Sequence, residues 1–224
     1  MLVLATLILS VSQFVFAEKM DLETHNVLIQ KIEKGFDKKS AIADTVQLRL
    51  ADLYADRARL KTMKEMDQGC TNCLKSKEDR QAALSKYLRL FEIYTGAEQE
   101  RILVQIVQMN RLMDSSFAKK KFYTKIITKK RYGKALKARA TQALAEIHFY
   151  DGDFKTAQQQ YKKAIQMKPS LRTYLTRYRL AWCSLNLGSV QSAQNQLVGI
   201  LKNKNDLSKD PTMHADMALS LIHI

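Results

Sequence analysis

The chain has 224 residues, and 46% of them are hydrophobic, which excludes a disordered chain because this composition can form a packed core. Glycine and proline are few, and no long run alternates Val, Ile and Thr with polar residues, so a protein built on sheets is excluded as well. The formal net charge of +15 favours acidic partners or anionic surfaces. We therefore expect an all-α protein.

The first 17 residues, Met1–Ala17, form an uncharged apolar segment that ends in Val15-x-Ala17. This pattern is typical of a secretory signal peptide that is cleaved before Glu18, and it predicts an exported protein. The segment lacks the Lys or Arg that usually precedes the apolar run. A membrane anchor is the alternative, although 17 residues is at the short limit for a membrane span.

Helical periodicity follows the apolar segment. The sequence predicts a first amphipathic helix over Asp21–Phe36 and a long second helix that begins after Ser40 and runs towards Met66. After a loop, helices are expected over Glu78–Tyr94 and Glu98–Met113. Another helix is expected after Ser115 and Ser116, which are candidate N-caps, with Ala118, Phe122 and Ile126 on its apolar face.

The loop after the second helix contains Cys70-Thr-Asn-Cys73. A structural zinc site would need two further ligands at similar spacing, and a haem attachment would need His where Leu74 stands. We therefore expect a local Cys70–Cys73 disulfide in an oxidising compartment, with no metal and no cofactor. Cys183 lies on a predicted buried helix face and is expected to be an inert small hydrophobic residue.

The segment Ala138–Leu171 predicts two short helices that fold back on each other. Gly152 suits the left-handed position after the first helix, Asp153 suits the N-cap of the second, and Pro169 ends the second. Second helices of this kind carry an alanine four residues before a large apolar side chain. Four such pairs recur at intervals of 35, 39 and 36 residues: Ala83/Tyr87, Ala118/Phe122, Ala157/Tyr161 and Ala193/Leu197.

These features resemble the tetratricopeptide repeat (TPR), a helix pair of about 34 residues. Four residues match the TPR pattern and three depart from it: Leu144, Ala157, Tyr161 and Pro169 match, whereas Thr141, Ala145 and His148 depart. The resemblance implies a right-handed α-solenoid of stacked antiparallel helix pairs. The stretch 178–188 also resembles repeats of large envelope proteins of gliding and predatory Gram-negative bacteria, which act in motility and envelope assembly.

We expect four segments. Residues 1–17 are the signal peptide, and 18–77 hold the N-terminal helices and the cysteine-containing loop. Residues 78–134 form degenerate TPR-like helix pairs, and 135–224 form a TPR domain whose last repeat is incomplete. No phosphate-binding loop, HExxH or GxSxG motif occurs, so the chain is not expected to be an enzyme.

The resemblance implies a non-catalytic scaffold of the bacterial cell envelope that binds a protein or peptide in the concave TPR groove. Such a protein would be periplasmic or envelope-associated, peripheral to the membrane, and without a small-molecule substrate. First helices line that groove, and seven residues are placed there: Arg139, Gln142, Glu146, Phe149, Tyr178, Trp182 and Asn186. The carboxylate clamp of some TPR proteins needs Lys and Asn where Gln142 and Glu146 stand, so capture of C-terminal peptides is not expected.

The alternative function is a basic binder of an anionic envelope surface or polymer. Phe117–Arg139 holds no acidic residue, and its candidate basic patch is Lys119, Lys120, Lys121, Lys125, Lys129, Lys130 and Arg131. A solvated helix face is the plainer interpretation of such a run. Nucleic acid is not the expected partner, because its recognition needs stacking or base-reading side chains among the charges.

Overall fold

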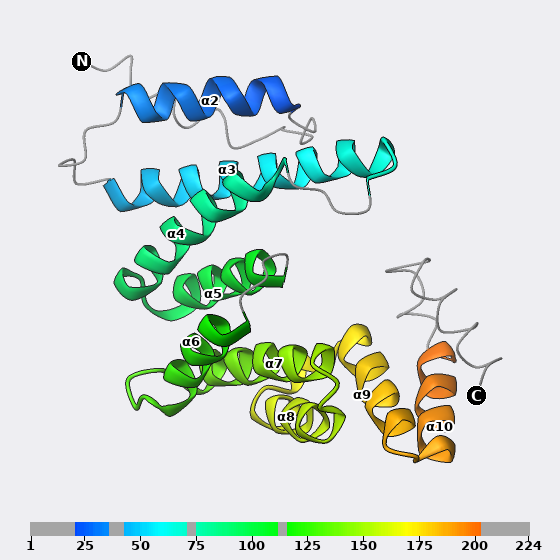
Figure 1. The fold of residues 1–224 in the computed structure, drawn as a ribbon. Helices are drawn as coiled ribbons and strands as arrows, with labels where there is room; N and C mark the ends of the chain where they lie inside the picture. The colour runs from blue at the N-terminus through cyan, green and yellow to red at the C-terminus, as the bar shows by residue number, and fades with distance from the viewer. Residues whose placement is uncertain (1–20, 36–42, 71–74, 112–115, 203–224) are drawn as a thin grey trace. The chain divides into compact units, whose positions relative to one another are not determined.

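The computed structural model describes residues 21–35, 43–70, 75–111 and 116–202, and all regular secondary structure in these ranges is helical (Figure 1). The expected all-α class is therefore confirmed. The apolar segment Met1–Ala17, Cys73 and the residues after Pro211 lie outside the described residues. Within the described ranges, every helix is too short or too polar to cross a membrane.

The helices fall close to the positions that periodicity predicts. In chain order they are α2 (Leu22–Gly35), α3 (Ala43–Asp67), α4 (Lys77–Ile93), α5 (Gly96–Arg111), α6 (Ser116–Thr128), α7 (Lys134–Tyr150), α8 (Phe154–Met167), the short 3-10 helix η1 (Pro169–Leu171), α9 (Tyr174–Asn186) and α10 (Val190–Leu201).

The chain divides into two compact units, Met1–Glu92 and Ile93–Ile224. Unit 1 contains α2, α3 and nearly all of α4, and unit 2 contains α5 to α10. The boundary between the two units follows Glu92, inside the segment 78–134 that was predicted to form degenerate TPR-like helix pairs.

In unit 1, α2 packs against α3 through an apolar cluster of Ile29, Leu50 and Leu53. Polar contacts join α3 to α4. The hydroxyl of Tyr87 donates a hydrogen bond of 2.6 Å to Oδ1 of Asp52. Tyr87 is fully buried, so this bond satisfies a group that would otherwise be costly to remove from water.

In unit 2, α7 and α8 form a helix hairpin, and α7 also packs against α5 and α6. Gly152 has a φ of +78°, as the turn requires, and Oδ1 of Asp153 accepts a hydrogen bond from the backbone N–H of Thr156 at 3.1 Å. Ala145 and Ala157 are fully buried, and small side chains here let the two helices approach closely. The hairpin predicted from this turn is confirmed.

One buried position of α6 differs from the repeat pattern, whereas Ile126 is buried as predicted. Tyr123 and Ile126 are fully buried, whereas Phe122 is only partly buried. Nδ2 of Asn110 in α5 donates a hydrogen bond of 3.0 Å to the hydroxyl of Tyr123. Because this bond satisfies the phenol, Tyr123 can occupy the buried position that was predicted for Phe122.

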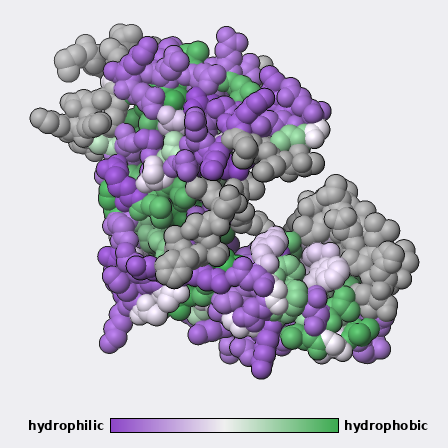
Figure 2. All heavy atoms as spheres, in the orientation of Figure 1, coloured by the Kyte–Doolittle hydropathy of each residue, from purple (hydrophilic) through white to green (hydrophobic). Residues whose placement is uncertain are grey.

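The hairpin of α9 and α10 repeats the same design at its turn. Gly188 has a φ of +78°, like Gly152. Ser189 occupies the N-cap of α10, but its side chain makes no capping hydrogen bond. Figure 2 shows hydrophobic atoms over α10, where Val190 and Val198 are 42% and 37% exposed.

Candidate partner-binding surface

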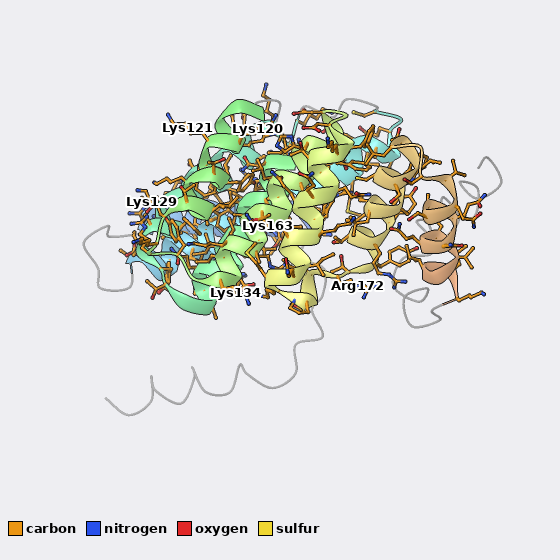
Figure 3. All side chains as sticks on the ribbon, turned by 90° about the horizontal axis from the view of Figure 1, so that it is seen from below. Lys120, Lys121, Lys129, Lys134, Lys163 and Arg172 are labelled. Carbon is orange, nitrogen blue, oxygen red and sulfur yellow. The ribbon has the colours of Figure 1, made fainter. Side chains whose placement is uncertain are left out.

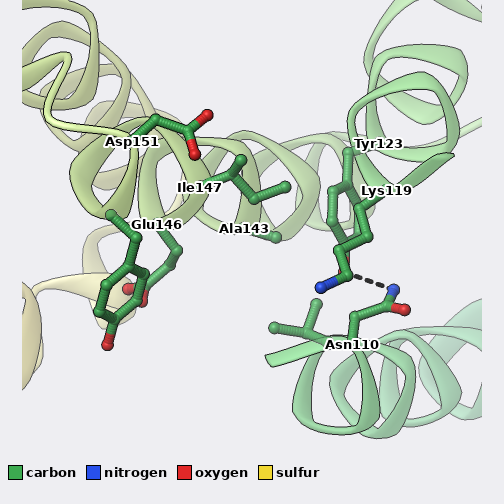
Figure 4. Close-up of a pocket in the computed structure, with 9 residues that line it drawn as sticks. Asn110, Lys119, Tyr123, Ala143, Glu146, Ile147 and Asp151 are labelled. Atoms are coloured by element: carbon green, nitrogen blue, oxygen red, sulfur yellow. Dashed lines mark hydrogen bonds between the residues drawn. The ribbon is translucent and has the colours of Figure 1, made fainter. Parts of the chain in front are cut away.

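Two adjoining cavities lie along α7. The first, of about 160 Å³, is lined by residues of α5, α7 and the start of α9: Val104, Val107, Gln108, Arg139, Gln142, Ala143, Glu146 and Leu175. The second, of about 170 Å³, is lined by residues from α5 to the turn after α7: Val107, Asn110, Lys119, Tyr123, Ala143, Glu146, Ile147, Tyr150 and Asp151 (Figure 4). Val107, Ala143 and Glu146 border both cavities. We call the two together the α7 groove.

Helix geometry brings these α7 side chains together. Arg139, Gln142, Ala143 and Glu146 are three or four residues apart, which places them on one side of the helix. Three of the seven predicted groove residues, Arg139, Gln142 and Glu146, therefore do line one cavity.

Each of these three side chains is bonded within the protein. Nε of Arg139 donates to Oε1 of Glu100 in α5 at 3.2 Å, and Nε2 of Gln142 donates to Oγ1 of Thr176 in α9 at 2.8 Å. Lys168 also pairs with Glu100. The hydrogen bond from Lys168, followed by that from Arg139, holds the pKa of Glu100 below its ordinary value despite partial burial. Glu100 is therefore a negative charge that fixes the position of Arg139.

Glu146 pairs with Arg179 of α9, a residue that the repeat pattern does not select. The guanidinium of Arg179 donates to the hydroxyl of Tyr150 at 3.0 Å and lies over two aromatic rings, 5.7 Å from the centroid of Phe149 and 5.4 Å from that of Tyr150. Cation–π contacts of this kind suit Arg in partly desolvated positions. The available sequence signal was the position of Arg179 four residues before Cys183, on the helix face that was predicted to be buried.

The other four predicted groove residues lie elsewhere on α7 and α9. Phe149 packs edge-to-face against Phe154, with ring centroids 5.7 Å apart, and joins the apolar cluster between α7 and α8. Tyr178 and Trp182 form an edge-to-face pair at 6.2 Å, and both are partly buried. Asn186 is exposed and donates a hydrogen bond of 2.9 Å to the carbonyl of Trp182. None of these four is among the described residues that line the two cavities.

The groove is lined by both apolar and polar side chains. Val104, Val107 and Leu175 are half-buried and supply apolar surface, whereas Tyr150 is 67% exposed. Protein-binding surfaces usually combine apolar and polar side chains in this way.

The members of the predicted basic patch differ in their surroundings. Lys119 lines the second cavity, and Nζ of Lys120 pairs with Oδ2 of Asp151 at 2.6 Å. The guanidinium of Arg131 lies over the ring of Tyr132, 4.6 Å from its centroid. Five members of the patch are exposed: Lys121, Lys125, Lys129, Lys130 and Arg131.

The buried Cys183 offers no reactive site in the folded protein. Cys183 is fully buried, and burial raises the pKa of its thiol to about 11, as expected of an inert core residue. Cys73 lies outside the described residues, so the Cys70–Cys73 disulfide stays a prediction. No group of three or more His, Cys, Asp or Glu side chains in the described ranges could hold a metal ion.

Comparison with known proteins adds no relative from which a function could be transferred. A scan against models of protein families matches none of them, and a search of curated proteins finds no similar chain.

Proposed function

We propose that this protein is a non-catalytic interaction scaffold that binds a segment of a protein partner in the α7 groove. The observation that carries the proposal is the pair of adjoining cavities along α7, with α5 on one side and the start of α9 on the other. In the proposed TPR-like solenoid these are the first helices of successive pairs, which line the concave surface.

The size of the cavities favours a peptide segment over a small molecule. Each measures about 160 to 170 Å³, below the roughly 300–1,000 Å³ that is usual for small-molecule sites. Because they adjoin along one helix, an extended or helical segment can place successive side chains in both.

The charges of the groove favour a partner that contributes apolar side chains. Arg139 pairs with Glu100, and Glu146 pairs with Arg179. These ion pairs hold the helices that border the groove and leave little net charge to select a ligand. Val104, Val107 and Leu175 supply the surface that an apolar anchor would cover. Tyr178 and Trp182 extend this proposed surface along α9.

Site-specific photo-crosslinking in the host tests the proposal. A photoreactive residue is placed at Leu175, which lines the groove, or at Gln166, an exposed residue of α8 that lines neither cavity. We expect a discrete adduct with one protein from position 175 and none from position 166. Equal labelling at both positions, or no adduct at either, contradicts the proposal.

We also propose that the scaffold is exported and acts in the cell envelope, peripheral to the membrane and possessing no cofactor. The apolar segment Met1–Ala17 and its Val15-x-Ala17 end support export. The intact mass of the protein isolated from its host tests this. A chain that begins at Glu18 agrees with export, and a cytosolic chain that retains Met1–Ala17 contradicts it.

A further inference from the structure

The net charge of the protein is confined to one part of the chain. Residues 116–202 hold 18 Lys and Arg against 3 Asp and Glu, whereas the remainder of the chain holds 19 of each. The formal charge of +15 therefore belongs entirely to the stretch from α6 to the end of α10.

The three acidic residues of this stretch are already engaged. Glu146 pairs with the buried Arg179, and Asp151 pairs with Lys120 at 2.6 Å. Asp153 accepts the N-terminal hydrogen bond of α8 from Thr156. Three acidic residues are far too few to neutralise the 18 basic residues of this stretch.

Five of the exposed cations come from successive elements of unit 2: Lys121 on α6, Lys129 at its end, Lys134 at the start of α7, Lys163 on α8 and Arg172 after η1. Figure 3, which views these helices from below, labels all five: Lys163 lies near the middle of unit 2, and the other four lie towards the edges of the view. We call these five residues the basic face. None of them is among the residues that line the α7 groove, so a partner in the groove leaves the basic face accessible.

We propose that the basic face docks on an anionic membrane surface, through phospholipid headgroups. Cations spread over several helices suit a surface on which negative charge is also spread, and each basic residue near such a membrane adds a similar increment of binding. Four of the five are lysines, which act as compact point charges, whereas recognition of individual phosphates favours the bidentate guanidinium of Arg.

The aromatic residues near the basic face argue against nucleic acid. Single strands are bound through bases stacked on exposed aromatic rings. Tyr123 and Tyr132 are 1% and 4% exposed, and Phe122 is partly buried with its ring edge-to-face against Tyr123. These rings belong to the packing of α6 and its turn, so they are not available for stacking.

Vesicle partitioning of the full chain tests the proposal at physiological salt. The partition coefficient of the protein from water onto vesicles is measured twice, once with phosphatidylcholine vesicles that contain phosphatidylglycerol and once with vesicles of phosphatidylcholine alone. The quantity compared is the ratio of the first coefficient to the second. This ratio removes any contribution that does not depend on lipid charge, including that of Met1–Ala17. The test variant changes four lysines of the basic face to Gln: Lys121, Lys129, Lys134 and Lys163. The matched control changes four exposed lysines of unit 1: Lys31, Lys34, Lys64 and Lys77.

The ratio should fall roughly 100-fold or more in the test variant, since each lysine near an anionic surface contributes about a fivefold factor. It should stay within about threefold of wild type in the control, and it should fall for wild type as salt rises. Equal losses in both variants would assign the effect to net charge alone, and a wild-type ratio near one would exclude membrane docking. Displacement from the vesicles by duplex DNA at equal phosphate concentration would assign the basic face to nucleic acid. Each of these three results overturns the proposal.

Discussion

The carboxylate of Glu146 in α7 pairs with the guanidinium of Arg179 in α9, and their side chains are only 12% and 5% exposed. Arg179 is held further by the hydroxyl of Tyr150 and by the rings of Phe149 and Tyr150. A mostly buried ion pair therefore connects two helices that border the α7 groove. Burying two charges costs free energy, so this contact fixes the relative position of the helices more than it adds to stability.

Removing one partner of this pair should be more harmful than removing both. Arg179→Met leaves the Glu146 carboxylate in a buried position without its cation, and we expect it to lower the free energy of unfolding by about 3–5 kcal/mol. The double variant Glu146→Leu, Arg179→Met should recover most of that loss. Urea unfolding followed by the fluorescence of Trp182, the single tryptophan of the chain, measures this in unit 2. A double variant as unstable as the sum of the two single variants would contradict this view of the pair.

In unit 1, Asp79 should make stability depend on pH. Its carboxylate accepts from Arg57 at 2.6 Å and pairs with Lys61 at 2.8 Å, and its side chain is 4% exposed. Burial alone would raise the pKa of Asp79, but the hydrogen bonds from Arg57 and Lys61 outweigh burial and hold the pKa below its ordinary value of 3.8. The stability that it contributes is therefore fully present above that value and is lost as the pH falls through the lower, folded-state pKa.

Asp79→Asn should accordingly cost about 3 kcal/mol at neutral pH, because it leaves Arg57 and Lys61 without their carboxylate. The difference between the variant and wild type should shrink as the pH is lowered below 4. Urea unfolding followed by far-UV circular dichroism at several pH values measures it. A difference that stays constant down to the lowest pH would show that charge is not the source of the stabilisation.

The thiol of Cys183 should react only when the protein unfolds. Burial raises its pKa from 9.0 to about 11, which lowers the reactive thiolate roughly 100-fold at neutral pH, and the folded chain also blocks the reagent. In a Cys70→Ser, Cys73→Ser background, labelling should be slow in buffer and rapid in urea. Labelling at equal rates under both conditions would place Cys183 on the surface.

The sequence was sufficient for the helices and for the α7–α8 hairpin because these depend on local periodicity, on Gly152 and on the Asp153 cap. It was insufficient for side chains whose environment depends on distant helices. Arg139 and Gln142 find their partners 39 and 34 residues away, in Glu100 and Thr176. Tyr123 replaces Phe122 in the buried position because Asn110 of α5 satisfies its hydroxyl. Periodicity indicates which face of a helix is apolar, but it does not indicate which polar atoms of other helices lie against that face.

Substitution of Trp182 tests whether this side chain on α9 binds the partner or only packs within the protein. Trp182 is partly buried, and its one aromatic neighbour among the described residues is Tyr178, 6.2 Å away. If the binding surface extends along α9, Trp182→Ala should weaken binding of the partner by about 2 kcal/mol, the usual size for a central anchor, with the thermal melt nearly unchanged. Titration of wild type and of Trp182→Ala with the partner that crosslinking identifies measures the binding free energy. A thermal melt of each protein measures its stability. Normal binding by a variant that melts several degrees lower would assign Trp182 to packing alone.

The most direct test of the scaffold is the yield of partner adduct from a crosslinker at Leu175 in two matched backgrounds. Val107→Glu puts a carboxylate between the two cavities, and Val190→Glu makes the same change at an exposed site on α10. Melts and Trp182 fluorescence establish that both proteins fold. Binding in the α7 groove predicts at least a roughly tenfold lower yield with Val107→Glu, because an apolar anchor would meet a charge, and an unchanged yield with Val190→Glu. Equal yields from two folded variants would contradict a partner site in the α7 groove.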